Sequence, residues 1–161
     1  MSSAPKIDIN FIKPFIEATI ETLKVQCSTT IKVGKPYKRV ADTELPNVDI
    51  AGIIGVTSSS FSGSISLCFP SDTFLKIMGG MLGEEFEVID KDLEDGAGEL
   101  LNIIFGFAKR MLNDQGYDIE KAIPSIVTGK DISVQHLSEE ASAICPFTLE
   151  ELSFYIEIAM D

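Results

Sequence analysis

The sequence predicts an α+β fold in which long amphipathic helices cover a largely antiparallel sheet. Residues 10–27, 71–83 and 91–115 carry apolar side chains at the three- and four-residue spacing of helices that pack on a core. Between and after them, β-rich segments follow one another across short turns. Consecutive strands joined by short turns pair antiparallel. The order of elements therefore favours helices packed on an antiparallel sheet.

The first predicted helix begins at Asn10, whose side chain can cap its N-terminus. Pro14 falls in the first turn, where a missing N–H is tolerated. We expect the residues before this helix, about 1–9, to be disordered. The apolar face of the helix is formed by Phe11, Ile12, Phe15, Ile16, Ala18, Ile20 and Leu23.

Three strands are predicted between the first and second helices. Residues 29–40 are β-rich, with a bend near Gly34–Pro36, and residues 48–58 and 61–69 predict a hairpin across a run of serines. The serines and glycines near that turn could instead hold a phosphate, but no lysine occupies the position that a P-loop requires. In the second hairpin strand, one side carries Ile65, Leu67 and Phe69, and the other carries Ser64, Ser66 and Cys68.

The second helix follows Pro70, with Ser71 as its predicted cap. Gly79, Gly80 and Gly83 are expected to weaken this helix and to end it. An acidic connector then leads to the third helix.

A short strand is predicted within residues 119–134, before or after Pro124, and residues 143–147 and 152–160 form a final pair. Each half of the chain therefore holds a long helix followed by strands, which suggests an internal duplication. In the last strand, one side carries Phe154, Ile156 and Ile158, and the other carries Tyr155, Glu157 and Ala159.

Composition indicates a single globular domain spanning residues 1–161, because 45% of the residues are apolar and 24% are charged. The net charge of −12, from 25 acidic and 13 basic residues, argues against binding to nucleic acid or to an anionic membrane. No apolar run approaches the roughly 20 residues of a membrane span, and no signal sequence is expected.

The cysteines Cys27, Cys68 and Cys145 stand far apart, and the single histidine is His136. This pattern predicts neither a disulfide framework nor a metal site, and it favours a reducing, cytoplasmic compartment. Cys145 and His136 could be imagined as a nucleophile and its base, but packing and surface exposure explain both residues.

The third helix, residues 91–115, carries a narrow polar stripe opposite a wide apolar one. At about 100° per residue from Asp95, Glu99 lies near about +40° and Asn102 near about −20°. Gly106 and Gly98 fall beside them, at about +20° and about −60°. A glycine inside a helix costs about 1 kcal/mol relative to alanine, so two beside one stripe favour a surface that another molecule approaches. The alternative is a solvated face on which glycines are tolerated by chance.

The pattern Asp95-x-x-x-Glu99-x-x-Asn102 resembles the D/S-x-x-x-E-x-x-N signature of the CheC/CheX/FliY phosphatases. Lys13-Pro14-Phe15-Ile16 is similar to the N-P-F-I start of CheX-type chains, and residues 63–70, G-S-I-S-L-C-F-P, resemble the family's strand that enters the second helix. The resemblance covers nearly the whole chain and implies a CheC-like, pseudo-duplicated domain.

CheC-type members often carry the signature on two helices, but the first helix here departs from it. Glu17 is present, whereas Lys13 occupies the acid or serine position and Ile20 replaces the asparagine. The resemblance therefore implies one site per chain, which is the CheX pattern.

The resemblance implies hydrolysis of the aspartyl phosphate on a CheY-like receiver domain, with no metal or cofactor bound by this chain. Asn102 would hold and aim the attacking water, and Glu99 would pair with a lysine of the receiver. Asp95 would add a contact at the rim, while Gly98 and Gly106 would let the partner's loops lie close. The Mg²⁺ ion would belong to the receiver.

The family also implies a homodimer that pairs through its sheets, and an unpaired apolar strand at residues 154–160 would fit such pairing. Two rival interpretations remain. The chain could be a module that binds a phosphorylated receiver without catalysis, like flagellar-switch components of related fold. It could also be a structural domain whose polar stripe is merely solvated.

Overall fold

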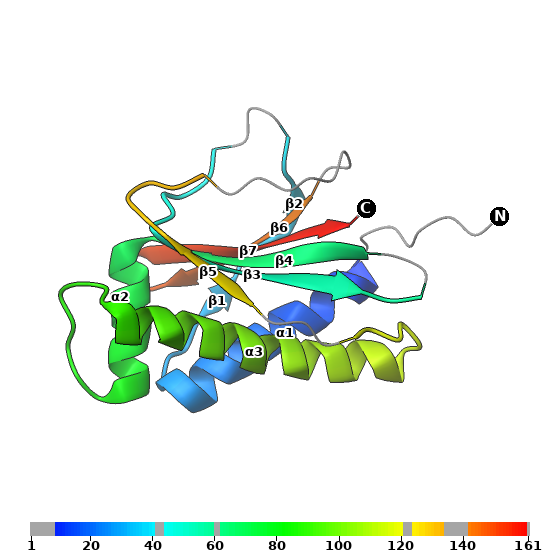
Figure 1. Ribbon diagram of the computed structural model, residues 1–161, viewed down its shortest axis with the longest axis horizontal. Coiled ribbons are helices and arrows are strands. Elements are labelled where there is room, and N and C mark those ends of the chain that lie inside the picture. The colour runs from blue at the N-terminus through cyan, green and yellow to red at the C-terminus, as the bar shows by residue number, and fades with distance from the viewer. Residues whose placement is uncertain (1–8, 41–43, 60–61, 121–123, 134–141, 161) are drawn as a thin grey trace.

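The computed structural model describes residues 9–40, 44–59, 62–120, 124–133 and 142–160 of the chain (Figure 1). Its helices are α1 (Ile9–Cys27), α2 (Ser71–Leu82) and α3 (Lys91–Asp114), and α1 and α3 lie together beneath the sheet while α2 stands across one end (Figure 1). The strands are β1 (Lys32–Val33), β2 (Tyr37–Lys38), β3 (Ile50–Thr57), β4 (Ser62–Phe69), β5 (Ser125–Thr128), β6 (Ala143–Leu149) and β7 (Leu152–Met160). The α+β class is therefore confirmed.

The sheet has the strand order β1-β6-β7-β4-β3-β5, with β2 also paired to β6, and every pairing among the described strands is antiparallel. The predicted hairpin is present as β3 and β4, which stay in register from Ile50↔Phe69 to Thr57↔Ser62. The final strand β7 lies between β4 and β6. The predicted pairing of the last two strands is confirmed, and because β7 is paired on both sides it gives no support to a dimer.

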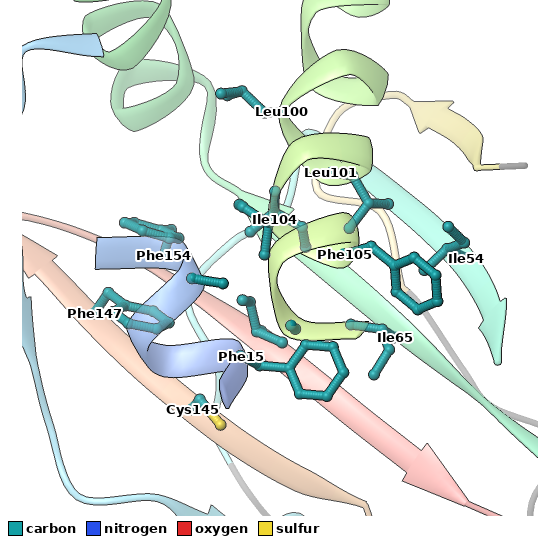
Figure 2. Close-up of a cluster of buried hydrophobic side chains, with 14 of the residues drawn as sticks. Phe15, Ile54, Ile65, Leu100, Leu101, Ile104, Phe105, Cys145, Phe147 and Phe154 are labelled. Carbon is teal, nitrogen blue, oxygen red and sulfur yellow. The ribbon is translucent and has the colours of Figure 1, made fainter. Parts of the chain in front are cut away.

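The main core lies between the helices and one face of the sheet. Figure 2 shows Leu101 and Phe105 of α3 pointing toward Ile54 of β3. From α3, the side chains buried in this core are Leu93, Ala97, Leu100, Leu101, Ile104, Phe105, Ala108 and Leu112. Because burying one leucine or phenylalanine side chain contributes about 1.5–3 kcal/mol, this stripe fixes the rotation of α3 about its axis.

Side-chain hydrogen bonds anchor α3 near both of its ends. Asp90 caps the N-terminus by accepting a hydrogen bond from the Leu93 N–H at 3.0 Å. Beyond the C-terminus, Asn113 Oδ1 accepts the Ile119 N–H at 2.6 Å, and Asn113 Nδ2 donates to the Ile119 carbonyl at 3.2 Å. Asn113 therefore holds the following loop against the helix.

Helix α2 differs from its prediction at the start. Ser71 is the first helical residue rather than the cap, and Pro70 occupies the cap position without a side-chain hydrogen bond. The Ser71 N–H donates instead to Asp49 Oδ2 at 2.8 Å. Gly79 lies inside the helix, and Gly83 ends it in the left-handed conformation at φ 73°.

The remaining differences concern element ends. Helix α1 begins at Ile9, one residue before the predicted cap, while residues 1–8 lie outside the described part of the chain. Residues 29–40 form two short strands on either side of Gly34–Pro36, where a bend was expected. Strand β5 follows Pro124.

The face of the sheet away from the helices carries a smaller cluster around a buried charge. Glu157 is 1% exposed, and Arg39 Nη1 donates to both of its carboxylate oxygens, at 2.8 and 3.0 Å. Ser142 Oγ also donates to Glu157. A buried carboxylate requires such partners. The apolar members of this cluster are Val48, Ala51, Cys68, Ile144 and Tyr155.

Candidate functional site

Helix α3 presents Asp95, Glu99 and Asn102 to solvent. All three side chains are exposed, whereas Leu100 and Leu101, which lie between the last two in sequence, are fully buried. The residues at i, i+4 and i+7 therefore project together from one side of a helix whose opposite side is fixed in the core. This is the arrangement that the polar stripe predicts.

Within the described part of the chain, neither Glu99 nor Asn102 has a side-chain partner. Among the described residues, no hydrogen bond or ion pair involves either side chain. A carboxylate and a carboxamide three residues apart thus offer acceptor oxygens and an NH₂ donor to whatever binds this face. An amide does not act as a base near neutral pH, so Asn102 is suited to holding a water.

The two glycines beside the stripe lie in different surroundings. A Cβ atom on Gly106 would meet nothing within 4 Å, so the helix surface is open there. A Cβ atom on Gly98 would stand 3.5 Å from Ile126 Cδ1 of β5, in ordinary contact. Gly98 therefore borders the edge strand of the sheet, and Gly106 marks the open part of the surface.

Charge changes along the exposed length of α3. Asp92 and Glu94 occupy the first turn, where the helix dipole favours anions, and Asp95 and Glu99 continue the acidic half. Lys109 and Arg110 follow in the second half. Asn102 therefore lies between an anionic part and a cationic part of the same surface.

One further pair of residues on α3 escaped the sequence analysis. Phe107 is 43% exposed, and the Cζ atom of Arg110 lies 5.9 Å from the centroid of its ring. At about 100° per residue, Arg110 falls about 20° from Glu99 around the helix. The signal was a phenylalanine at the border of the apolar stripe, with a cation three residues later.

The first helix does not repeat the site. Lys13 Nζ and Glu17 Oε1 lie 3.9 Å apart as an exposed pair, an interaction worth at most about 1 kcal/mol. Ile20 is partly buried against the main core. The acid of the partial signature is thus paired within its own helix, and no amide stands where Asn102 stands on α3.

The alternative of a cysteine nucleophile conflicts with the structure. Burial raises the pKa of Cys27 to about 11 and the pKa values of Cys68 and Cys145 to about 12. Because the thiolate is the nucleophile, these thiols are unreactive at neutral pH. The suggested base, His136, lies outside the described residues.

The described residues contain no group of three or more histidine, cysteine, aspartate or glutamate side chains that could hold a metal ion. A hollow of about 1030 Å³ lies between α2 and the loop before α3, and none of the site residues lines it. The candidate site is instead the outer face of a helix, a shape that suits a protein surface better than a small molecule. The hollow is lined by Asp72, Leu75, Lys76, Gly79, Gly83, Glu84, Glu85, Phe86, Glu87, Val88 and Asp90.

Two known proteins match most of the length of this chain. The CheY-P phosphatase CheX of Thermotoga maritima is 28% identical over 130 residues, which cover 80% of this chain and 82% of that protein. A CheC-like superfamily protein from Shewanella sp. PV-4 is 35% identical, with a TM-score of 0.89 over 96% of this chain and 99% of that one.

A third likeness concerns the fold alone. In the crystal structure of the CheX–CheY–BeF₃–Mg²⁺ complex from Borrelia burgdorferi, the matched chain is 23% identical, with a TM-score of 0.78 over 95% of this chain and 99% of that one. In the present chain, no helix among the described residues is long and apolar enough to cross a membrane.

The family model described as chemotaxis phosphatase CheX matches residues 50–148, a segment that includes β3, β4, α2 and the whole of α3. This segment is more than half of the 161 residues. The chain belongs to the CheX family of chemotaxis phosphatases.

Proposed function

We propose that this chain is a phosphatase that removes the phosphoryl group from the phospho-aspartate of a CheY-like response-regulator receiver domain. Membership of the CheX family supports the reaction, as does the likeness to a protein named a CheY-P phosphatase. The observation that carries the proposal is the exposure of Glu99 and Asn102 on one face of α3, without partners among the described residues.

Hydrolysis of an aspartyl phosphate requires that the attacking water be positioned, more than that the phosphate be activated. An acyl phosphate is already reactive, and its attacking water must lie in line with the leaving carboxylate. The carboxamide of Asn102 can accept a hydrogen bond from the water through its oxygen and donate to a phosphoryl oxygen through its NH₂. We assign to Asn102 the role of aiming this water.

Glu99 serves a different purpose, because a carboxylate beside a phosphoryl group is repelled unless a cation lies between them. The lysine at the phosphorylation site of a receiver would provide that cation. A charge-assisted bond from this lysine to Glu99 would fix the docked geometry and bring Asn102 to the phosphoryl group. Asp95, one turn earlier, would add a contact at the rim.

The magnesium ion belongs to the partner in this proposal. A receiver holds Mg²⁺ beside its phosphoryl group, and this chain supplies an amide and a carboxylate to the assembled site without ligating the ion. Gly106, beside which nothing lies within 4 Å of an added Cβ, leaves room for a partner loop. Gly98 would let a partner loop approach the helix at its border with β5, where an added Cβ would stand 3.5 Å from Ile126 Cδ1.

Location and assembly follow as parts of the proposal. A receiver substrate and three unpaired thiols fit the cytoplasm. The family resemblance supports a homodimer, for which the exposed edge strands β1 and β5 offer pairing surfaces. Sedimentation of the purified protein would test the homodimer.

The proposal is tested by incubating the protein with purified phosphorylated receivers of the same cell and following the phosphate lifetime of each. We expect one receiver to lose phosphate faster than it does alone. Binding to a phosphorylated receiver without a shorter lifetime would show a non-catalytic module. A lack of phosphorylation-dependent binding to every receiver would leave only a structural domain.

A further inference from the structure

Lys109 lies on the same stripe of α3 as Asn102. The residues Asn102, Gly106 and Lys109 stand at i, i+4 and i+7 in the sequence. The same spacing joins Asp95, Glu99 and Asn102. At about 100° per residue, Lys109 falls about 20° from Asn102 around the helix, so the two side chains project from one face. A protein surface that is seated on Asn102 therefore faces Lys109 as well.

The distance between Lys109 and Asn102 is short on the scale of a protein contact. Seven residues of helix correspond to about 10.5 Å along the axis, whereas a standard interface covers about 800 Å² of each partner. Long side chains on a helix lean toward its N-terminus, so Lys109 can direct its ammonium over the turn that contains Gly106. A Cβ atom on Gly106 would meet nothing within 4 Å, so no side chain fills the space between Lys109 and Asn102 on this face.

The ammonium of Lys109 has no partner in the described part of the chain, where no hydrogen bond or ion pair involves it. Neighbours on a helix stand three or four residues apart, and the four such neighbours of Lys109 are uncharged. They are Phe105, Gly106, Leu112 and Asn113. Lys109 is itself partly buried, as expected when the stem of a lysine lies along the protein and its charged end reaches water. The charge is therefore available to a partner that covers this face.

Charge complementarity indicates which group of a receiver fits Lys109. Mg²⁺ in proteins is held by carboxylates together with phosphate oxygens, so a receiver that holds Mg²⁺ beside its phosphoryl group carries carboxylates there. This chain has a net charge of −12, and Asp95 and Glu99 would repel those carboxylates. Glu99 matches the lysine of the receiver at one end of the stripe. At the other end, Lys109 offers the opposite charge, which matches a carboxylate.

We propose that Lys109 is a positioning residue of the site, whose ammonium binds a receiver carboxylate at the rim of the phosphorylation pocket. This inference rests on the proposed phosphatase function. The ion pairs of Glu99 and Lys109 have opposite polarity and lie on either side of Asn102, so a receiver docked the other way round would bring like charges together. Lys109 takes no part in the chemistry, because about 10.5 Å of helix separates it from the residue that holds the water.

The test is steady-state dephosphorylation of the cognate receiver by wild type and by variants at Lys109. Lys109→Gln should raise KM about three- to tenfold, and Lys109→Glu should raise it about ten- to thirtyfold because a repulsion replaces the attraction. Both should leave kcat within about twofold of wild type. Lys109→Arg keeps the charge and should keep KM within about twofold. Added salt should raise KM less in Lys109→Gln than in wild type, since the screened ion pair is missing.

Helix α1 provides the matched control, since Lys24 is an exposed lysine on a different helix. Lys24→Gln removes the same charge from the chain and should leave KM unchanged. Circular dichroism and urea unfolding confirm that each variant is folded. If Lys24→Gln raises KM as much as Lys109→Gln, the net charge of the chain explains the effect, and the assignment of the contact to Lys109 is overturned.

The affinity for a receiver loaded with beryllofluoride separates failure of this inference from failure of the proposed function. If wild type binds the loaded receiver without hydrolysing a phosphorylated one, the phosphatase assignment fails, and the Kd values of Lys109→Gln and Lys109→Glu decide the contact. Unchanged KM and Kd in both variants would overturn the contact.

A fall in kcat of Lys109→Gln at unchanged KM would also overturn the inference, because it would place the ammonium on the reacting phosphoryl group. A wild-type protein that binds no loaded receiver of the same cell would remove both this contact and the proposed function.

Discussion

The side chain of Leu101 lies directly on the backbone of Gly52. A Cβ atom on Gly52 would stand 3.0 Å from Leu101 Cδ2 and 3.4 Å from Ile126 Cδ1, which is tighter than most contacts in proteins. Leu101 is fully buried, and the next residue, Asn102, is exposed. Because Gly52 has no side chain, α3 can approach β3 closely at this point. The same contact therefore fixes the position of Asn102, the residue after Leu101.

Enlarging Gly52 should therefore destabilise the fold and displace the site. We expect Gly52→Ala to lower the free energy of unfolding by about 1 kcal/mol and Gly52→Val by up to about 3 kcal/mol, as overpacked cores do. Urea unfolding measures both values. The matched control is Gly55→Ala in the same strand, where an added Cβ meets nothing within 4 Å. Equal stability of Gly52→Val and wild type would show that α3 is not held by this contact.

Asp49 joins the start of α2 to the loop after β5, and it should make stability depend on pH. Its Oδ1 accepts the Asp131 N–H at 2.9 Å, and its Oδ2 accepts the Ser71 N–H at 2.8 Å. The bond from Asp131 is the main reason that the pKa of Asp49 lies below its ordinary value; partial burial opposes the shift, and the Ser71 bonds and Lys130 add to it. A lowered pKa in the folded state means that the stabilisation is complete above the unfolded pKa of about 3.9 and is lost as pH falls through the folded pKa.

Asp49→Asn should accordingly be less stable than wild type at pH 7, by about 1 kcal/mol if it weakens the start of α2 as lost caps do. The difference should shrink as the pH is lowered below about 4. Chemical unfolding at a series of pH values measures this dependence. Glu85→Gln, which changes an exposed acid in the loop before α3, should follow the wild-type curve. A stability difference that grows with acidity would contradict the account of Asp49.

Local sequence patterns predicted most of the fold because most elements are defined within themselves. The hairpin follows from alternation on both sides of a serine turn, and the third helix follows from its apolar stripe. Ser71 was misassigned as a cap because the acceptor at the start of α2 is Asp49, 22 residues earlier in the chain. Strand alternation predicted which face of the last strand carries Glu157. Its partner Arg39 is 118 residues away in the chain, and no local pattern identifies such a pair.

The features of the site also divide into those that local periodicity predicts and those that depend on tertiary packing. Exposure of Asp95, Glu99 and Asn102 follows from helix periodicity alone. The contact of Gly98 with Ile126 depends on how β5 packs beside α3, which periodicity does not contain. Phe107 was assigned to neither face because it lies at the edge of the apolar stripe, where small rotations of the helix decide between burial and exposure.

Glu99 should contribute to both docking and turnover. Glu99→Ala should lower kcat/KM by about 10- to 100-fold, which corresponds to a charge-assisted hydrogen bond worth about 1.5–3 kcal/mol. Because the bond joins opposite charges, the gap between variant and wild type should narrow as salt is added. Steady-state kinetics at two ionic strengths measure it, with Glu21→Ala on the exposed face of α1 as control. A variant that keeps wild-type kcat/KM would remove Glu99 from the site.

The most direct measurement of the central claim is the rate at which saturating Asn102→Ala protein dephosphorylates the cognate receiver, together with its Kd for the beryllofluoride-loaded receiver. We predict that the rate falls by about 100-fold, as when one positioned group is removed from a transition state, while Kd stays within about twofold of wild type. Asn47→Ala, at an exposed asparagine in the segment before β3, should behave as wild type. Near wild-type dephosphorylation by Asn102→Ala would contradict the claim that this amide aims the attacking water.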